Sequence, residues 1–536
     1  MPISDTIPPP EFVELGATKA NGLDLLGLRL PVQTIGGVLL NGVTSVTRTV
    51  RYLSLRTWLL YRYVNAQPPP PDRHRSFLDY ASRAEAALTL ANLIRSRSTG
   101  GLIGPVRGTS KLDEEGDIID LEQLAKQLAV VIYAGASDQL RLTRSRDPQV
   151  SEIGSERGEP LALVVEQSLG DTSIGRRLGR SDLLDLATRD ELEELGRLAW
   201  IEEIPEAERR ELIRALVPEE LAPGDKPRVG TYAVLLALAE QTGGRLDEHD
   251  LFDEAVRPVR KTPAVLAETL DGWLLYAVRD AIAVTGEAVL SVVVDKLQEL
   301  DPESTGFSDE ALVRQLLADS VPQQLAALRE LGLGDGAEDL GAMAFSELEE
   351  RVRDATPEVA SEQGLRRWPG MLTEPSLYRG VGGVRGGALV FALVSWMVSE
   401  RRAGLAARQD EARARLLSHQ GNSRFGLNQI VLPRLAEWRG RRLSVASALS
   451  ELTHLVIDQH LRIAWVRLAQ DPRKDVSVLL RDGDRLIRRV GYEGGRTASR
   501  LPQAIGWLHQ LGLLADEGLT EDGHRVLGLA LRSLVR

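Results

Sequence analysis

Residues 444–490, SVASALSELTHLVIDQHLRIAWVRLAQDPRKDVSVLLRDGDRLIRRV, carry the clearest structural pattern in the chain. Leucine, isoleucine and valine recur at helical spacing from Ser444 to Leu468, which predicts a long helix. Two β-like runs follow, at residues 476–480 and 485–490, with an Asp-Gly pair between them. Because Asp-Gly between apolar runs is a strong hairpin signal, the stretch predicts a helix followed by a β-hairpin.

Two more helices are predicted after this hairpin, over residues 499–511 and 521–534. The phrase Leu508-His509-Gln510-Leu511-Gly512-Leu513-Leu514 leads into Leu519-Thr520-Glu521-Asp522-Gly523. This order resembles winged-helix domains, in which a recognition-like helix ends in a Leu-Gly-Leu turn before a wing. The resemblance implies a small α+β module over about residues 443–536. A generic helical cap with a hairpin is the alternative.

The helix predicted over residues 499–511 is amphipathic, with an apolar face that includes Leu501 and Leu508. The opposite face combines a cation, two amides and an aromatic ring, which suit phosphate contact, base-edge hydrogen bonds and stacking. The nucleic-acid-binding residues predicted on this basis, with neighbouring arginines, are Arg488, Arg489, Arg496, Arg500, Gln503, Trp507 and Gln510. Two alternatives stay open. The face is an ordinary solvated one with Trp507 partly packed on a neighbouring helix, or the winged helix binds protein.

Most of the remaining chain is predicted to be helical as well. The predicted helices cover residues 28–64, 76–96, 118–134, 182–200, 206–217, 232–241, 262–300, 309–331 and 388–418. Alternating apolar strands are scarce, and no fixed repeat period marks a solenoid. The fold class we expect is therefore mainly α, a multidomain helical protein with a small C-terminal winged-helix-like α+β module.

Charge is segregated along the chain, although the net charge is −12. Residues 401–536 hold 23 basic and 14 acidic residues, and residues 1–110 hold 12 and 7, so the section between them is strongly acidic. We expect three regions: a basic helical region with a proline-rich spacer (1–110), an acidic helical middle of two subdomains (111–378) and a basic C-terminal region (379–536). Such asymmetry favours binding to a polyanion or to a partner chain, and a basic partner suits the acidic middle.

Composition excludes several classes of protein. The chain of 536 residues has no cysteine, so disulfides and cysteine-based zinc sites are excluded. The longest uncharged apolar stretch, residues 386–399, is too short to cross a bilayer, and no signal peptide is recognisable. We therefore expect no membrane partner and a cytoplasmic location.

No catalytic or metal site is legible. None of the seven lysines follows a glycine, which excludes a P-loop, and none has an acid two residues before it, as restriction-type nucleases need. No two of the seven histidines are three or four residues apart, and no Gly-x-Ser-x-Gly motif occurs. We predict no catalytic residue, metal ligand or cofactor, and whether the protein is an enzyme stays open, with a non-enzyme favoured.

The most glycine-dense loop is residues 379–387, RGVGGVRGG, ahead of a predicted helix. Backbone amides at a helix start can hold an anion, with help here from Arg379 and Arg385. The alternative is a hinge between the acidic middle and the basic end.

The N-terminal segments 30–36, LPVQTIG, and 50–58, VRYLSLRTW, resemble the opening of uncharacterised helical proteins encoded in bacterial defence and restriction-type gene clusters. The resemblance covers about a tenth of the chain and brings context, not site residues. The leading hypothesis is a non-enzymatic DNA-interacting subunit of a bacterial defence (antiviral) or genome-maintenance system, contacting DNA through the C-terminal module. The alternatives are a helical adaptor for protein partners and a nuclease-like enzyme with an unrecognised carboxylate site.

Overall fold

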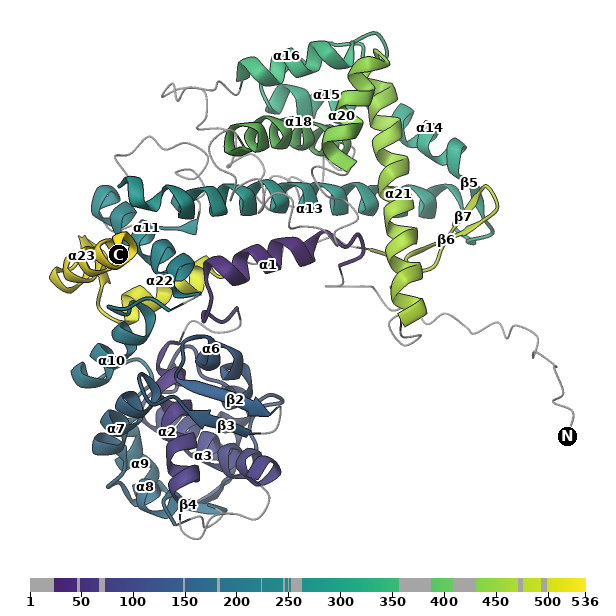
Figure 1. Ribbon diagram of the computed structural model, residues 1–536. Helices are drawn as coiled ribbons and strands as arrows, with labels where there is room; N and C mark the ends of the chain where they lie inside the picture. Colours follow the sequence, from purple (N-terminus) through teal and green to yellow (C-terminus); the bar gives the residue numbers. More distant parts are fainter. Residues whose placement is uncertain are drawn as a thin grey trace, which may run out of the picture. The chain divides into compact units, whose positions relative to one another are not determined.

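The structure is a computed structural model, and it consists mainly of helices with a few very short strands (Figure 1). It describes residues 24–45, 49–66, 73–147, 150–180, 184–222, 224–243, 246–248, 250–251, 263–355, 387–407, 430–470, 476–492 and 499–536. Within these residues, no helix is both long and apolar enough to span a lipid bilayer.

The chain divides into two compact units, and each is assembled from separate segments of sequence. Unit 1 comprises residues 1–32 and 275–497, and unit 2 comprises residues 33–274 and 498–536. Two helices, α1 (Arg29–Leu39) and α13 (Ala267–Leu300), each contain a point where one unit gives way to the other. A division into consecutive segments therefore does not describe these units.

Unit 1 is a helical assembly with one three-stranded sheet. Besides parts of α1 and α13, its elements are β5 (Phe307–Ser308), α14 (Asp309–Asp319), α15 (Val321–Glu330), α16 (Phe345–Ala355), α18 (Ala388–Ala407), α20 (Leu432–Gly440), α21 (Val445–Gln470), β6 (Leu479–Asp482) and β7 (Arg485–Arg488). Helix α18 contains the apolar stretch noted in the sequence, and nearly all of it is buried against α15, α20 and α21. The stretch is a core helix, as its length predicts.

Aromatic packing forms the centre of this core. The rings of Trp396 and Trp438 are parallel to within 5°, with their centroids 5.8 Å apart. Phe345 meets Trp438 edge-on at the same centroid distance, and the Trp438 Nε1 donates to Glu451 at 2.7 Å. Each indole therefore buries its apolar surface, and the Nε1–H group of Trp438 also has a hydrogen-bond acceptor.

The predicted hairpin is confirmed. Strands β6 and β7 pair in antiparallel fashion with Asp482 opposite Arg485, and Gly483 takes the left-handed conformation (φ 61°) in the turn. The buried His460 of α21 joins the hairpin to the helix, because its Nε2 accepts hydrogen bonds from the backbone N–H groups of Val478 and Leu479. Strand β5 then pairs with β7 as the third strand.

Unit 2 contains the larger number of short elements. They are the remainder of α1 and α13, with α2 (Arg51–Asn65), α3 (Arg73–Arg95), α4 (Pro105–Glu114), β1 (Ile118–Asp120), α5 (Ala129–Ile132), α6 (Ala134–Gln139), β2 (Thr143–Asp147), β3 (Val150–Ile153), α7 (Gly158–Leu169), α8 (Ser173–Leu178), β4 (Leu186–Thr188), α9 (Arg189–Leu198), α10 (Glu206–Leu216), α11 (Asp225–Thr242), the 3₁₀ helix η1 (Ala264–Leu266), α22 (Leu501–Gln510), β8 (Leu514–Ala515), β9 (Gly518–Leu519) and α23 (Glu521–Val535). Helix α2 packs on α7, α3 on α9, and α11 on α23.

Buried charges in unit 2 are paired. Asp225 accepts hydrogen bonds from Arg157 at 2.7 Å and from Arg228 at 2.6 Å, and Arg228 also donates to the Leu216 carbonyl oxygen. All three charged side chains are buried. Because a charge can be buried only when it is paired and hydrogen-bonded, this cluster is a structural one.

Four predicted helices are wrong in extent. The helix predicted over residues 182–200 contains strand β4 and becomes helical only at Arg189, where α9 begins. The helix predicted over residues 118–134 begins instead as strand β1, which pairs with β4 (Ile119 opposite Ala187) and buries only its middle residue. The helix predicted over 28–64 is divided, because the chain turns at Gly42 (φ 86°) beyond the end of α1. The helix predicted over 309–331 breaks at Ser320 between α14 and α15.

The winged-helix module over residues 443–536 is not confirmed. Its predicted helices and hairpin exist, but α21, β6 and β7 belong to unit 1, whereas α22 and α23 belong to unit 2. Between α22 and α23 lies a separate hairpin, β8–β9, with two residues in each strand.

Candidate interaction site

Helix α22 does not present the polar face that its sequence predicts. The Trp507 side chain is fully buried, so it is not available for base stacking. The Gln510 side-chain oxygen accepts a hydrogen bond from the backbone N–H of Val50 at 2.8 Å, and Gln503 donates to the Ser45 carbonyl oxygen at 3.2 Å. The helix is therefore packed on both sides within unit 2, and its amides hold neighbouring backbone.

The predicted arginines belong to different units of the chain. Arg488 and Arg489 end the hairpin of unit 1, whereas Arg500 precedes α22 in unit 2. Both Arg488 and Arg489 are half-buried, and the Arg489 backbone N–H donates to the Val478 carbonyl oxygen at 2.9 Å. Arg496, and the predicted anion-binding residues Arg379 and Arg385, lie outside the described residues.

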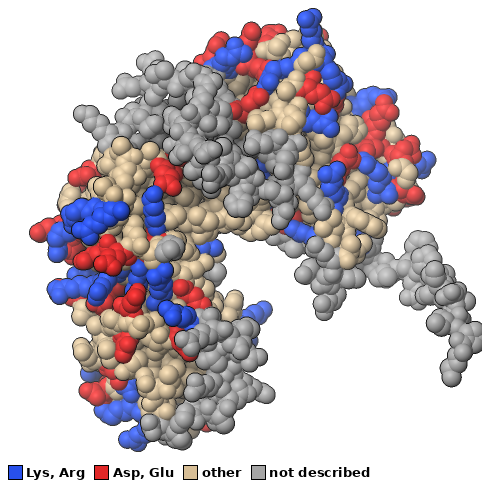
Figure 2. Space-filling view, in the orientation of Figure 1, with Lys and Arg blue, Asp and Glu red and all other residues tan. Residues whose placement is uncertain are grey.

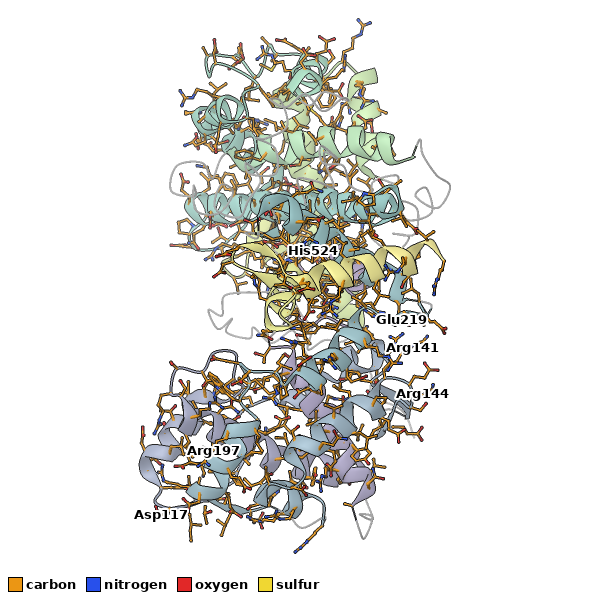
Figure 3. All side chains as sticks on the ribbon, turned by 90° about the vertical axis from the view of Figure 1, so that its left-hand side faces the viewer. Asp117, Arg141, Arg144, Arg197, Glu219 and His524 are labelled. Carbon is orange, nitrogen blue, oxygen red and sulfur yellow. The ribbon has the colours of Figure 1, made fainter. Side chains whose placement is uncertain are left out.

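Charges of both signs are interspersed on the surfaces in view. Figure 2 shows acidic and basic side chains alternating over α14, α21 and the β6–β7 hairpin of unit 1. On unit 2, the labelled Arg141 and Arg144 are well separated from Arg197 and Asp117 (Figure 3). On the face drawn in Figure 2, the coloured residues do not form the continuous basic surface that duplex DNA favours.

Unit 1 does contain an open pocket of about 500 Å³ between α20 and α21, which we call the α20–α21 pocket. The two helices lie beside one another in Figure 1. The pocket is lined by apolar and charged side chains in similar numbers: Ile430, Pro433, Arg434, Glu437, Leu455, Asp458, Gln459 and Arg462. Its volume is in the range typical of ligand-binding clefts, but its mixed lining is more polar than that of most small-molecule sites.

Helix periodicity explains why these side chains share one surface. On α21, Leu455, Asp458, Arg462 and Trp465 follow one another at spacings of three and four residues, which places them on one face. The opposite side of the same helix carries His460 and other buried residues that face the core. The exposed face therefore consists of an apolar residue, an acid, a cation and an indole in one stripe.

Trp465 is unusually exposed for its type. Its side chain retains 71% of its accessible surface, whereas five other tryptophans, Trp58, Trp273, Trp396, Trp438 and Trp507, are fully buried. A large aromatic side chain left in solvent beside a pocket marks a binding surface more often than it marks a monomer surface.

Most charges of the pocket are compensated locally. Arg434 and Glu437 pair at 2.7 Å within α20, and Asp458 accepts from Arg481 of the hairpin at 2.7 Å. Arg462 is exposed, and no ion pair joins it to a residue that the structure describes. The pocket thus offers one uncompensated cation next to apolar surface.

A chain of ion pairs lies along the other flank of the same stripe. Arg481 bridges Asp458 and Asp309, and the His454 Nδ1 lies 3.3 Å from the Asp309 carboxylate. The hydrogen bond and the negative charge of Asp309 raise the pKa of His454 above its ordinary value. Burial raises the pKa of Asp309, but the bonds and charges of His454 and Arg481 outweigh it and lower that pKa. These pairs hold the hairpin against α21 and α14.

Glu85 of unit 2 is an acid with a strongly raised pKa. Burial raises its pKa to about 7, although it accepts hydrogen bonds from the backbone N–H groups of Ala129 and Val130 at 2.7 and 2.6 Å. Arg56 donates to the Val130 carbonyl oxygen beside it. The adjoining cavity is only about 10 Å³, enough for one water. Both carboxylate oxygens are occupied by the start of α5, so Glu85 acts as a structural helix cap.

The described residues contain no cluster with the composition of a metal site. Among them, no group of three or more histidines and acidic residues has the geometry to hold a metal ion. His454 turns toward Asp309 and not into a shared site with His460, whose ring is occupied by backbone groups.

Comparison with known proteins gives no match. No protein-family model matches the sequence, and neither a curated protein nor a solved structure resembles it significantly. The geometry of the two units is therefore the basis for a functional proposal.

The α20–α21 pocket is not predicted by the sequence. The sequence contains part of the pattern, because Trp465 is a large apolar residue on the side of α21 that carries the charged residues Asp458 and Arg462. The partner wall, Pro433 to Glu437, lies on a separate helix, and only the folded chain brings it opposite this stripe.

Proposed function

We propose that this chain is a non-enzymatic helical adaptor that binds a partner protein through the α20–α21 pocket of unit 1. The observation that carries the proposal is the exposed Trp465, aligned on one helix face with Asp458 and with Arg462, which forms no ion pair with a described residue. Tryptophan and arginine are the residues most enriched among the dominant contacts of protein interfaces. An apolar floor with a charged rim is also the usual anatomy of such interfaces.

The pocket composition favours protein over nucleic acid as the ligand. Glu437 and Asp458 line the pocket and form ion pairs with Arg434 and Arg481, which leaves Arg462 alone among the described lining residues to meet a phosphate, whereas duplex binding needs several such contacts. A peptide, in contrast, can place an apolar side chain on Leu455 and an acid against Arg462.

Site-specific photocrosslinking in cells of the natural host tests this proposal. A benzophenone amino acid placed at Trp465 should give protein adducts, whereas the same group at the 74% exposed Arg314 should not. The adducts are identified by mass spectrometry, and a mixture of light and heavy-isotope chains distinguishes another protein from another copy of this chain. Adducts only to nucleic acid, or no adduct at position 465, would overturn the adaptor function.

DNA contact is the second candidate function, and a specific observation supports it. Arg485 and Arg488 of strand β7 form no ion pair with any described residue, and residues 430–470 and 476–492 contain ten arginines and five acidic residues. Arg485 and Arg488 are three residues apart in a strand, however, so they point to opposite faces of the hairpin. A duplex can therefore engage them together only at the hairpin edge.

Fluorescence anisotropy with short duplex and single-stranded DNA over a salt series tests the DNA candidate. Binding that weakens steeply with salt, and further when Arg485, Arg488, Arg489 and Arg496 are changed to alanine, supports contact at the hairpin. Alanine at Arg434 of α20 and at Arg441, the residue that follows this helix, serves as a control. No binding at low salt contradicts the candidate. We propose that either function serves a bacterial defence or genome-maintenance assembly, and the resemblance of residues 30–36 and 50–58 supports this.

A further inference from the structure

We infer that the occupant of the α20–α21 pocket is a second copy of this chain, so that the protein forms a twofold symmetric dimer through helix α21. The inference rests on the proposed function, because it names the partner of the same surface. Three properties of that surface carry it: the position of Trp465, the pattern of charge and the exposure of apolar groups.

The position of Trp465 suits an antiparallel pair of α21 helices. Trp465 follows Asp458 on the same face of the helix, at about 10 Å along the axis. When two copies pack with a twofold axis near Arg462, each Trp465 lies opposite Asp458 of the other copy. The indole then enters the open pocket of about 500 Å³ beside Leu455, and both pockets are filled in the same way.

The charges of the surface are self-complementary, as a twofold interface requires, because the same residues meet on both subunits. Arg462 lacks an acid partner among the residues described, whereas Asp458 retains 51% of its side-chain surface despite its bond to Arg481. In the antiparallel arrangement, each Arg462 lies within one helical turn of Asp458 of the second copy. The two Arg462 side chains approach each other at the axis, and each is neutralised by Asp458 of the other copy, so that the ion pair forms twice.

The apolar groups supply the attraction that ion pairs alone do not. Trp465 is 71% exposed and Leu468, one turn further on, is 36% exposed. Aromatic anchors that fill a partner pocket dominate binding, whereas partly exposed ion pairs contribute mainly to specificity and register. Trp465 is thus expected to provide most of the affinity, and Arg462 to fix the antiparallel register.

Sedimentation velocity of the full chain over a concentration series tests the inference. We expect a species of twice the 58.7 kDa chain mass that dissociates on dilution. Trp465→Ser should weaken the dimer by about 30-fold or more, the loss typical of an anchor residue. Val535→Ser is the matched control, because Val535 is an equally exposed apolar residue (75%) in unit 2, and it should leave the dimer unchanged.

A charge exchange tests the register. Arg462→Asp should weaken the dimer by placing like charges together, and adding Asp458→Arg to it should restore much of the affinity. Far-UV circular dichroism confirms that each variant folds.

The inference is overturned if Trp465→Ser leaves the dimer affinity unchanged. It is also overturned if adding Asp458→Arg to Arg462→Asp does not restore the dimer. A wild-type protein that stays at 58.7 kDa also overturns it. If that monomer still crosslinks from position 465 to a different protein, the adaptor function stands and only the identity of the partner is wrong. If it gives no protein adduct, both proposals fail.

Discussion

The guanidinium of Arg51 and the carboxylate of Glu208 lie 3.0 Å apart, and neither side chain has any accessible surface. Arg51 also donates to the backbone carbonyl oxygens of Glu203 and Leu198 at 2.8 and 2.9 Å, so helix α2 holds the end of α9 and the start of α10. A buried pair of this kind is costly to break, because the remaining charge keeps its desolvation penalty.

Arg51→Met should therefore destabilise unit 2 by about 3–5 kcal/mol, measured by urea unfolding. The double variant Arg51→Met/Glu208→Leu should lose less than the single one, since it leaves no unpaired buried charge. Arg210, an exposed arginine of α10 that pairs with Glu206, is the control, and Arg210→Met should change the free energy of unfolding by less than about 0.5 kcal/mol. A double variant that is less stable than Arg51→Met contradicts this account.

Glu85 should make the stability of unit 2 depend on pH. Its folded pKa of about 7 exceeds the unfolded value of 4.5, so the folded state holds the proton more tightly. The stabilising contribution is complete below pH 4.5 and is lost as the pH rises through 7, to a total of roughly 3 kcal/mol. Thermal unfolding from pH 4.5 to 8 measures this, and Glu85→Gln should flatten the profile in that window. If the stability of Glu85→Gln depends on pH as the wild type does, other groups cause the pH dependence.

His454 should titrate above an ordinary histidine because of Asp309. Asp309→Asn should lower the pKa of His454, which NMR of the imidazole protons measures directly. The pair contributes stability that is complete below the ordinary histidine pKa of 6.5 and is lost as the pH rises through the raised value. If the pKa of His454 is the same in the Asp309→Asn variant, the 3.3 Å contact between the two side chains is not formed in solution.

Two glycines of unit 1 with open space around them should respond to alanine in opposite ways. Gly483 has φ 61° in the hairpin turn, and a Cβ there meets no atom within 4 Å, so Gly483→Ala should cost about 1–2 kcal/mol through the backbone alone. Gly440 lies at the end of helix α20 with equal space and no positive φ, so Gly440→Ala should be neutral or stabilising by up to about 1 kcal/mol. Urea unfolding compares the two, and a stable Gly483→Ala variant would exclude the described turn.

Local pattern was sufficient to predict helix α21, the β6–β7 hairpin and helices α10, α22 and α23, because periodicity and the Asp482-Gly483 turn act over a few residues. Strand β1 could not be predicted, since Ile118 becomes a strand residue only by pairing with Thr188, 70 positions away.

The candidate site shows the same limit of local pattern. Trp507 has the sequence context of an exposed recognition residue, yet it is buried because α22 packs in unit 2 beside a segment 460 residues earlier, where Gln510 meets Val50. Arg462 and Trp465 can be recognised as candidate binding residues only in the folded chain, where α20 and α21 together line a pocket. Sequence spacing identifies the face of a helix, whereas the neighbour of that face is decided by tertiary packing.

The interleaving of the two units has a consequence for biosynthesis. Unit 2 begins at residue 33 but includes α22 and α23, and the Ser533 hydroxyl donates to the Glu219 carbonyl oxygen at 3.1 Å. Residues 33–274 of this unit therefore leave the ribosome long before the helices that complete it, and the part of unit 1 from Leu275 to Thr497 is translated in between. Contacts of such long sequence separation form late in folding, so the surface of α11 that packs on α23 stays uncovered until the C-terminal helix has been synthesised.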